Sequence, residues 1–494
     1  MYHVLHKMPP YAEALSKTKW ESDLCKAIAT YMEDLVELEG PTKGIYVSCD
    51  GAVCAAKRRQ QRLRRFKGPW AAMMEQQLKQ PYRQPVGMSE PQLLNKNVAV
   101  SWDQNALTPG SAFMAQLGDV LVAAGKRIQA KGGVPVTVST TAEAGEGEHK
   151  LLAHMRSLTS VPASCTIYGL DADLILLAML LGVDTGASVR LMREAQEFEK
   201  GHGNGWRSLD VTALAAVMIP GCSPARIRDF VASMSLLGND FLPRSLTHTV
   251  RDDGIPELIA ALQTHVWSLG LQIVAADGSL DRRGLAALVS FWASHEERDL
   301  VVAANAALKA SRFHPGVGAT PDETALKEWN SQPARWATVA KILDPRDKNR
   351  LKEGWQKIYK SWHPGSAANY LQGVAWTWDY YSGRSVDQAW FFDEHLPPRW
   401  SDVAAALAGG PPSVAAPPVQ YPKPLPDWLH LLAVLPADSV QRLLPAKAQQ
   451  LMLKAPWYWP TSWSVYDVGK TQLWECEPVI PIIPEKVLRG WAKE

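Results

Sequence analysis

The sequence predicts an α/β fold in which a largely parallel central sheet is flanked by helices and followed by a helical, aromatic-rich C-terminal region. Short β-branched runs, bounded by Gly, Asp or Ser, alternate with helical patterns through the first half of the chain. The expected strands are residues 44–51, 134–140, 166–174 and 188–194, and the expected helices between them are residues 19–40 and 108–128. Thr108 is expected to cap the second helix, with Pro109 at its first helical position.

Three regions are expected, because 494 residues are too many for one simple core. Residues 1–275 carry the alternating pattern, residues 276–345 a connecting helical region, and residues 346–494 the aromatic-rich region. A Pro/Gly/Ala stretch at residues 409–419 is expected to hold no regular element. Most of the twenty tryptophans, Trp376 and Trp378 among them, are expected to pack in cores.

The composition excludes several classes of protein. A net charge of +2 argues against a general polyanion binder, so any contact with nucleic acid must come from a local basic patch. The six cysteines form no CxxC pair, which argues against a zinc ribbon or a disulfide scaffold and indicates a reducing compartment. The longest apolar run, residues 174–183, is too short to span a bilayer, and no signal-peptide layout opens the chain. We therefore expect a protein of the cytosol or the nucleus that does not bind membranes.

Carboxylates collect at the ends of the expected strands, where ligands of parallel sheets bind. Two glutamates lie in the glycine-rich segment GEGEHK, and two aspartates in GLDADLILL have the period-2 spacing that sends both to one side of a strand. The full set is Asp50, Glu146, Glu148, Asp171, Asp173 and Asp240.

Six carboxylates at one edge would repel one another unless they were protonated or bound cations. Oxygen ligands suit Mg²⁺ or Mn²⁺, and two such ions can activate a water and stabilise the leaving oxygen of a phosphodiester. A single DxD is usually a solvated strand end, and a single GND is usually a turn. Their joint occurrence at strand ends favours a metal site.

A basic segment begins seven residues after Asp50. KRRQQRLRRFK, residues 57–67, holds seven basic residues, and at 3.6 residues per turn Lys57, Gln61, Arg64 and Arg65 share one face. Two arginines can bind a phosphate bidentately, with the lysine and glutamine as further donors. The alternative is a solvated helix or a localisation signal. The nearby carboxylates favour a phosphate pocket.

At this point the residues resemble one family. DGAVCAAKRRQQRLRRF, LTPGSAFMAQL, GEGEHK, YGLDADLILL and LLGNDFLP are similar, in order, to the motifs of the XRN 5′→3′ exoribonucleases. NYLQGVAWTWDYYSG, AWFFDEHLPP, LLAVLPADSVQRLLP and LWECEPVIPIIPEKVL resemble the family's second conserved region. Residues 276–345 remain unmatched.

The resemblance implies a nuclease core of the PIN/FEN type, closed by the second conserved region. It implies an enzyme of RNA degradation and mRNA decay that hydrolyses single-stranded RNA processively from a 5′-monophosphate and releases nucleoside monophosphates. Two Mg²⁺ or Mn²⁺ ions would serve as cofactors, and we expect a monomer. Trp390 would stack on one side of the first base and His6 on the other. The catalytic metal ligands would be Asp50, Glu146, Glu148, Asp171, Asp173 and Asp240, and the 5′-phosphate ligands Lys57, Gln61, Arg64 and Arg65.

The sequence departs from the family at its first motif. The family's first catalytic aspartate would fall one residue before Met1, and Tyr2 stands where the family has Asn. We expect a misassigned start or a missing N-terminal segment, because the other acidic positions are intact. Two alternatives stay open: supply of the missing piece by another polypeptide, or a catalytically weakened decoy that binds 5′-monophosphate RNA. A structure-specific flap DNA nuclease is disfavoured, because such nucleases lack the second conserved region.

Overall fold

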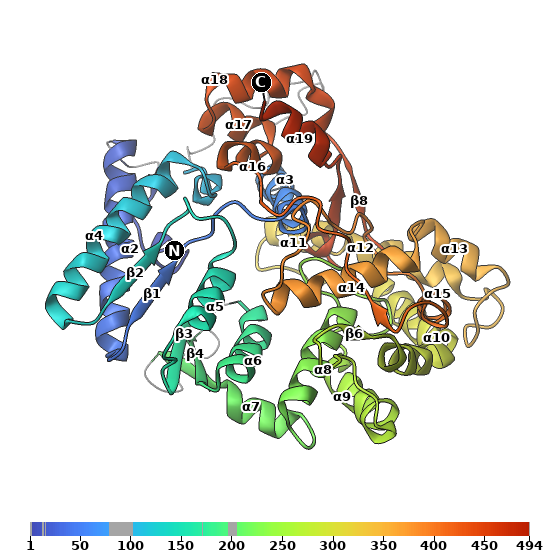
Figure 1. Ribbon diagram of the computed structural model, residues 1–494. Coiled ribbons are helices and arrows are strands. Elements are labelled where there is room, and N and C mark those ends of the chain that lie inside the picture. The colour runs from blue at the N-terminus through green and yellow to red at the C-terminus, as the bar shows by residue number, and fades with distance from the viewer. Residues whose placement is uncertain are drawn as a thin grey trace, which may run out of the picture.

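The computed structural model describes residues 2–11, 14, 16–78, 102–169, 171–195 and 205–493. The N-terminal elements lie on the left of Figure 1, the middle of the chain continues below and to the right, and helices α16–α19 lie at the top. Helix α3 (Ala55–Leu78) lies in the centre of the view, between α16 and the rest of the molecule. This central helix carries the basic segment, so it places that segment between the N-terminal and C-terminal parts.

The strands form small sheets. β1 (Ile45–Ser48) pairs in parallel with β2 (Val136–Ser139). β3 (Ser164–Tyr168) pairs in parallel with β4 (Ser188–Glu194), and β5 (Trp206–Asp210) is antiparallel to β4. The α/β class and the parallel pairing agree with the sequence. A single, largely parallel central sheet is not found among the described residues, since no strand there joins β1 to β3.

Two short antiparallel pairs lie in the second half. β6 (Leu280–Asp281) pairs with β7 (Ser413–Val414), and β8 (Ser464–Tyr466) pairs with β9 (Glu477–Val479). β7 lies inside residues 409–419, so the prediction of no regular element there was wrong. The two strands are short, and one further hydrogen bond extends their pairing. The Arg282 N–H donates to the Pro412 carbonyl at 2.8 Å.

The predicted helices are confirmed as α2 (Lys17–Glu39), α4 (Ala112–Gly132) and the basic helix α3. The predicted start of α4 was wrong. Thr108 follows a 3₁₀ turn at Gln104–Leu107, and Ser111 caps α4 by accepting the Met114 N–H at 3.1 Å. A serine hydroxyl three residues before the donor satisfies one of the free N–H groups of the first turn, and Thr108 is too far away to do so.

The predicted strand 166–174 is too long. β3 ends at Tyr168, and Asp173 is the first residue of helix α6 (Asp173–Thr185). The apolar run after Asp173 is long enough for a buried helix, and its residues Leu174 to Leu181 supply a large part of the core. Asp171 and Asp173 therefore do not share a strand face, and the period-2 argument for them was wrong.

Further helices run through the described parts of the chain, and those that begin between residues 276 and 345 are α10, α11 and α12. In the part of the chain that the structure describes, no helix combines the length and the apolar character needed to cross a bilayer. The helices are α1 Tyr2–Leu5, α5 Gly147–Ser157, α7 Val211–Met218, α8 Pro224–Met234, α9 Gly254–His265, α10 Arg282–Ser311, α11 Pro321–Asn330, α12 Gln332–Trp336, α13 Trp355–Trp362, α14 Ala367–Tyr381, α15 Trp400–Leu407, α16 Asp427–Val434, α17 Ala437–Leu443, α18 Ala446–Lys454 and α19 Glu485–Trp491.

One hydrophobic core connects the first half of the chain to α14. It contains apolar residues of α5, α6 and α8 together with the buried tryptophans Trp376 and Trp378 of α14, which confirms the packing role expected for those two. All six cysteines are free, as their spacing indicated. The expected region boundaries near residues 275 and 345 stay predictions. The shared core brings the C-terminal end of α14 close to α5 and α6.

Helix α3 is held by buried arginines. Arg62 is almost fully buried and donates to the carbonyls of Ala433 at 2.6 Å, Pro481 at 3.1 Å and Tyr458. Burial lowers the pKa of Arg62 to about 9. Arg58 forms an ion pair with Glu485 at the start of α19. Part of the basic segment therefore holds the C-terminal helices.

We predict that Arg62→Met lowers the free energy of unfolding by about 3 kcal/mol, because three buried carbonyls lose a charged donor. Arg64 on the same helix is exposed, so Arg64→Met should change stability by no more than about 0.5 kcal/mol. Urea unfolding followed by circular dichroism measures both. Equal effects of the two substitutions would contradict the structural role of Arg62.

The buried ring of His430 in α16 leads us to predict that the stability of the fold depends on pH. Its ring is fully buried, neither ring nitrogen has a hydrogen-bond partner among the described residues, and burial beside Arg58 and Arg65 lowers its pKa to about 3. Below its ordinary pKa of 6.5 the unfolded chain takes up a proton at this ring and the folded chain does not, so stability falls as pH falls from 6.5 towards 3.

His430→Leu should therefore flatten the acid limb of the stability profile by up to about 1.4 kcal/mol per pH unit. His314 is exposed, and His314→Gln serves as the matched control with an unchanged slope. The measurement is urea unfolding at a series of pH values between 4 and 7. An unaltered slope in His430→Leu would contradict the prediction.

Candidate functional site

The loops after β1 and β2 are joined by their backbones. The Gly51 N–H donates to the Gly145 carbonyl at 2.8 Å, and the Gly145 N–H donates to the Ala52 carbonyl at 2.9 Å. A Cβ at Gly51 would lie 1.9 Å from the Glu143 carbonyl oxygen, and Gly145 has a φ of 109°. Only glycine suits either position. The glycines noted in the sequence therefore let two strand ends meet.

This meeting places three of the predicted acidic residues together. Glu146 is the N-cap residue of α5, and Glu148 lies in its first turn. Asp50, after β1, accepts the Gly147 N–H at 2.8 Å through its Oδ1 atom. A helix N-terminus favours negative charge, which partly offsets the repulsion between these carboxylates.

Lys57 connects this group to Asp240. Its Nζ atom lies 2.5 Å from Glu146 Oε2 and 2.7 Å from Asp240 Oδ2. Burial alone would lower the pKa of Lys57, but the charges of Glu146 and Asp240 raise it above its ordinary value. A positive charge is therefore held between residues that lie far apart in the sequence.

The pKa values show how crowded the carboxylates are. Burial, followed by the charges of Glu146 and Asp50, raises the pKa of Glu148 to about 8. Burial, followed by the charges of Asp240 and Asp171, raises the pKa of Asp173 to about 6. Each shift favours the protonated acid, so the cluster has a deficit of positive charge that a bound cation would reduce.

The donor set suits a hard divalent cation, because it consists of carboxylate oxygens. Among the described residues, however, no three Asp, Glu, His or Cys side chains converge on one ion position. Asp171 is exposed in the turn before α6. The residues present thus match Mg²⁺ or Mn²⁺ in chemistry, and the other acidic side chains would have to turn towards Glu146 and Asp173 to surround an ion.

Two tyrosines of α14 complete the cluster, and the sequence reasoning missed them. The Tyr380 hydroxyl donates to Glu146 Oε1 at 2.7 Å, and the Tyr381 hydroxyl donates to Asp173 Oδ2 at 3.3 Å. His149 stacks on Tyr380 with ring centroids 4.0 Å apart, and burial lowers the pKa of His149 to about 3. The residues lie in NYLQGVAWTWDYYSG, but nothing in the pattern shows which carboxylates they would reach.

The predicted phosphate ligands take separate positions along α3. Lys57 contacts the carboxylates, and Arg64 is exposed. Gln61 is half-buried, and its Oε1 atom has no hydrogen-bond partner in the described part of the chain. Arg65 donates to Asn105 Oδ1 at 2.9 Å. A bound phosphate on these four residues stays a prediction.

The predicted base clamp also stays a prediction. His6 is exposed in the turn after α1. Trp390 is half-buried, with its ring centroid 5.2 Å from that of Trp376 and its edge against Gly373. No ring contact joins His6 to Trp390 where the structure is described. A base placed between them would itself hold the two rings apart.

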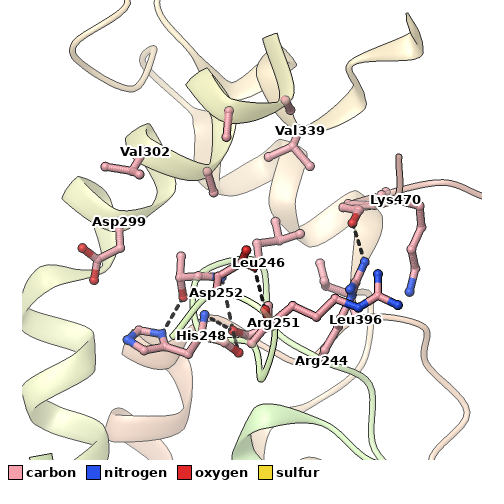
Figure 2. Close-up of a pocket in the computed structure, with 18 of the residues that line it drawn as sticks. Arg244, Leu246, His248, Arg251, Asp252, Asp299, Val302, Val339, Leu396 and Lys470 are labelled. Carbon is pink, nitrogen blue, oxygen red and sulfur yellow. Dashed lines mark hydrogen bonds between the residues drawn. The ribbon is translucent and has the colours of Figure 1, made fainter. Parts of the chain in front are cut away.

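The structure also contains a cavity of about 950 Å³, and Figure 2 shows part of its lining. The loop after Asp240 lines it with Arg244, His248 and Arg251, and Asp299 and Lys470 lie on other walls. None of the six predicted acidic residues lines this cavity. Its charges are of both signs, so it differs in kind from the acidic cluster.

The comparisons with known proteins agree on one family. Residues 1–195 match the family model described as XRN 5′-3′ exonuclease N-terminus. The 5′-3′ exoribonuclease 2 of Yarrowia lipolytica is 29% identical over 328 residues, which cover 57% of this chain and 32% of the relative. Human 5′-3′ exoribonuclease 1 is 26% identical over 532 residues, covering 93% of this chain and 30% of the relative. The chain spans about a third of the length of these curated relatives.

The matched region contains most of the acidic cluster. Asp50, Glu146, Glu148, Asp171 and Asp173 all lie within residues 1–195, as does the basic segment. The match to the human relative extends the similarity over nearly all of this chain. Residues 1–195 therefore match the XRN exonuclease N-terminal region, and the chain is similar to XRN-type exoribonucleases over most of its length.

Proposed function

We propose that the chain is a 5′→3′ exoribonuclease that hydrolyses 5′-monophosphorylated single-stranded RNA processively to nucleoside monophosphates. The observation that carries the proposal is the gathering of carboxylates from separate segments around the Lys57 ammonium, with raised pKa values for Glu148 and Asp173. Matched relatives named 5′-3′ exoribonuclease support the same activity. A cluster of this kind suits reactions that need concentrated positive charge at a phosphodiester.

Two Mg²⁺ or Mn²⁺ ions would be the cofactors. Such ions supply an activated water and stabilise the leaving oxygen. Lys57 would keep Glu146 and Asp240 at their positions before an ion is bound, and the helix N-terminus at Gly147 would orient Asp50. The residues that would hold the ions are Asp50, Glu146, Glu148, Asp171, Asp173 and Asp240.

The 5′ end of the RNA would bind along α3. Gln61 and Arg64 would take the terminal phosphate together with Arg65, because guanidinium groups bind phosphate oxygens bidentately. Lys57, at the N-terminal end of this row, would place that phosphate beside the carboxylates. Trp390 and His6 would hold the first base by stacking, which tolerates any sequence.

A second candidate is a protein that binds 5′-monophosphate RNA and cleaves it weakly or not at all, acting as a decoy. One observation favours it: no three side chains of the cluster converge on one ion position in the described residues. Both candidates use the phosphate pocket, and they differ in whether the bound RNA is hydrolysed.

The deciding experiment uses 5′-labelled RNA that carries a monophosphate, a hydroxyl or a triphosphate, incubated with Mg²⁺. We expect labelled mononucleotide to be released from the monophosphate form only, because the pocket recognises that end. Tight binding without release would favour the decoy. Cleavage of branched DNA in preference to RNA would contradict both candidates.

We predict that Asp171→Ala lowers the release of mononucleotide by at least about 100-fold, because one carboxylate of the metal site is lost. Asp34 is exposed on α2, away from the cluster, and Asp34→Ala is the matched control with wild-type activity. Single-turnover rates at saturating RNA measure both variants. A wild-type rate in Asp171→Ala would show that Asp171 binds no catalytic ion.

Arg64→Ala is expected to reduce the preference for a 5′-monophosphate over a 5′-hydroxyl by about 10-fold or more, because one charged donor to the phosphate is lost. Competition between the two RNAs in one reaction measures the ratio of kcat/KM values. Arg283, exposed at the start of α10, provides the control substitution Arg283→Ala. An unchanged ratio in Arg64→Ala would remove Arg64 from the pocket.

A further inference from the structure

We infer that Tyr380 and Tyr381 are positioning residues that hold two carboxylates of the acidic cluster, Glu146 and Asp173, in the orientation that binds the metal ions. The inference rests on the proposed function, which assigns those ions to the cluster. It concerns the hydroxyl groups of two neighbouring residues at the end of α14, more than 200 residues after both carboxylates.

Tyr380 fixes one oxygen of Glu146. Its hydroxyl donates to Oε1 at 2.7 Å, while Lys57 lies 2.5 Å from Oε2. The Glu146 side chain is only 3% exposed, so few waters reach it. Each carboxylate oxygen has a second lone pair that a metal can use. With donors on both oxygens, the carboxylate cannot rotate about its last bond without losing a hydrogen bond.

The ring of Tyr380 is itself held on several sides. Its centroid lies 5.0 Å from that of Trp376, 4.0 Å from that of His149 and 5.4 Å from that of Phe241. Trp376 is anchored in turn, because its indole N–H donates to the Asp387 carbonyl at 3.0 Å. The hydroxyl therefore has little freedom to follow Glu146, and it sets the carboxylate position.

Tyr381 and Phe241 extend the same arrangement. Tyr381 donates to Asp173 at 3.3 Å, a longer and weaker bond than that of Tyr380. Phe241 follows Asp240 directly and packs on the rings of Tyr380 and Tyr381 at 5.4 and 6.2 Å. One aromatic group thus supports carboxylates of three segments. Partners of metal-bound carboxylates typically change metal affinity by about 10- to 100-fold when they are removed.

Helix α14 offers a matched control. Tyr370 lies on the same helix and is fully buried, and its hydroxyl has no hydrogen-bond partner among the described residues. Tyr370→Phe removes a hydroxyl from the same helix without touching a carboxylate. An effect that depends only on helix packing should therefore appear in Tyr370→Phe as well as in Tyr380→Phe.

The test measures Mn²⁺ binding directly, by the loss of the electron paramagnetic resonance signal of free Mn²⁺, on the full chain. We expect Tyr380→Phe to raise the dissociation constant about 10- to 100-fold, Tyr381→Phe to raise it less, and Tyr370→Phe to leave it unchanged. Thermal unfolding of each variant shows whether it is folded. The rate of mononucleotide release is also measured at increasing Mn²⁺ concentrations. The Mn²⁺ concentration that gives half of the maximal rate should rank the variants in the same order.

Unchanged Mn²⁺ affinity in folded Tyr380→Phe would overturn the inference, as would an equal loss in Tyr370→Phe. Should Tyr380→Phe not fold, Tyr381→Phe decides by the same comparison. If the Mn²⁺ dissociation constants of the wild type and the variants follow the expected order but the wild type cleaves no RNA, the inference stands and the proposed function fails. If the wild type cleaves RNA and its variants bind Mn²⁺ equally, only the inference fails. A wild type that binds no Mn²⁺ overturns both.

Discussion

Repulsion among clustered carboxylates is the constraint on which the rest of this structure depends. The acidic side chains come from the loop after β1, the starts of α5 and α6, and the loop after η5, the 3₁₀ turn at Ser235–Leu237. Unopposed, they would push those segments apart or take up protons. The fold opposes them with the Lys57 ammonium, the Gly147 N–H and two tyrosine hydroxyls. These groups belong to three helices, α3, α5 and α14, so the cluster also holds these helices together.

Helix α3 directs its positive charges to separate surroundings. Arg58 and Arg62 are turned towards the C-terminal helices and are nearly inaccessible to water. Lys57 is directed at the carboxylates, and Arg64 remains exposed. A helix segment with seven basic residues among eleven can present positive charge on both of its faces. Because the basic residues lie so close together, the sequence alone did not show which of them face the C-terminal helices and which face the carboxylates.

Much of the fold and of the candidate site could be predicted, because the signals are local. Glycines beside the acidic residues indicated the sharp turns, and β-branched runs located the strands. Asp171 and Asp173 were misjudged because an apolar run after a strand has the same composition whether it continues as a strand or begins a helix. Arg62 and Tyr380 could not be found, since their partners lie hundreds of residues away and one sequence does not reveal such contacts.

The hydrogen bond from Tyr380 to Glu146 has a consequence for the order of events during synthesis. It closes a loop of 234 residues, and a contact of such separation forms late because much chain entropy must be lost first. A ribosome releases the N-terminal segment well before Tyr380 has been made. The carboxylates of a growing chain therefore lack their tyrosine partners. Full order in the cluster therefore comes only after Tyr380 and Tyr381 have been synthesised and α14 has packed against α5 and α6.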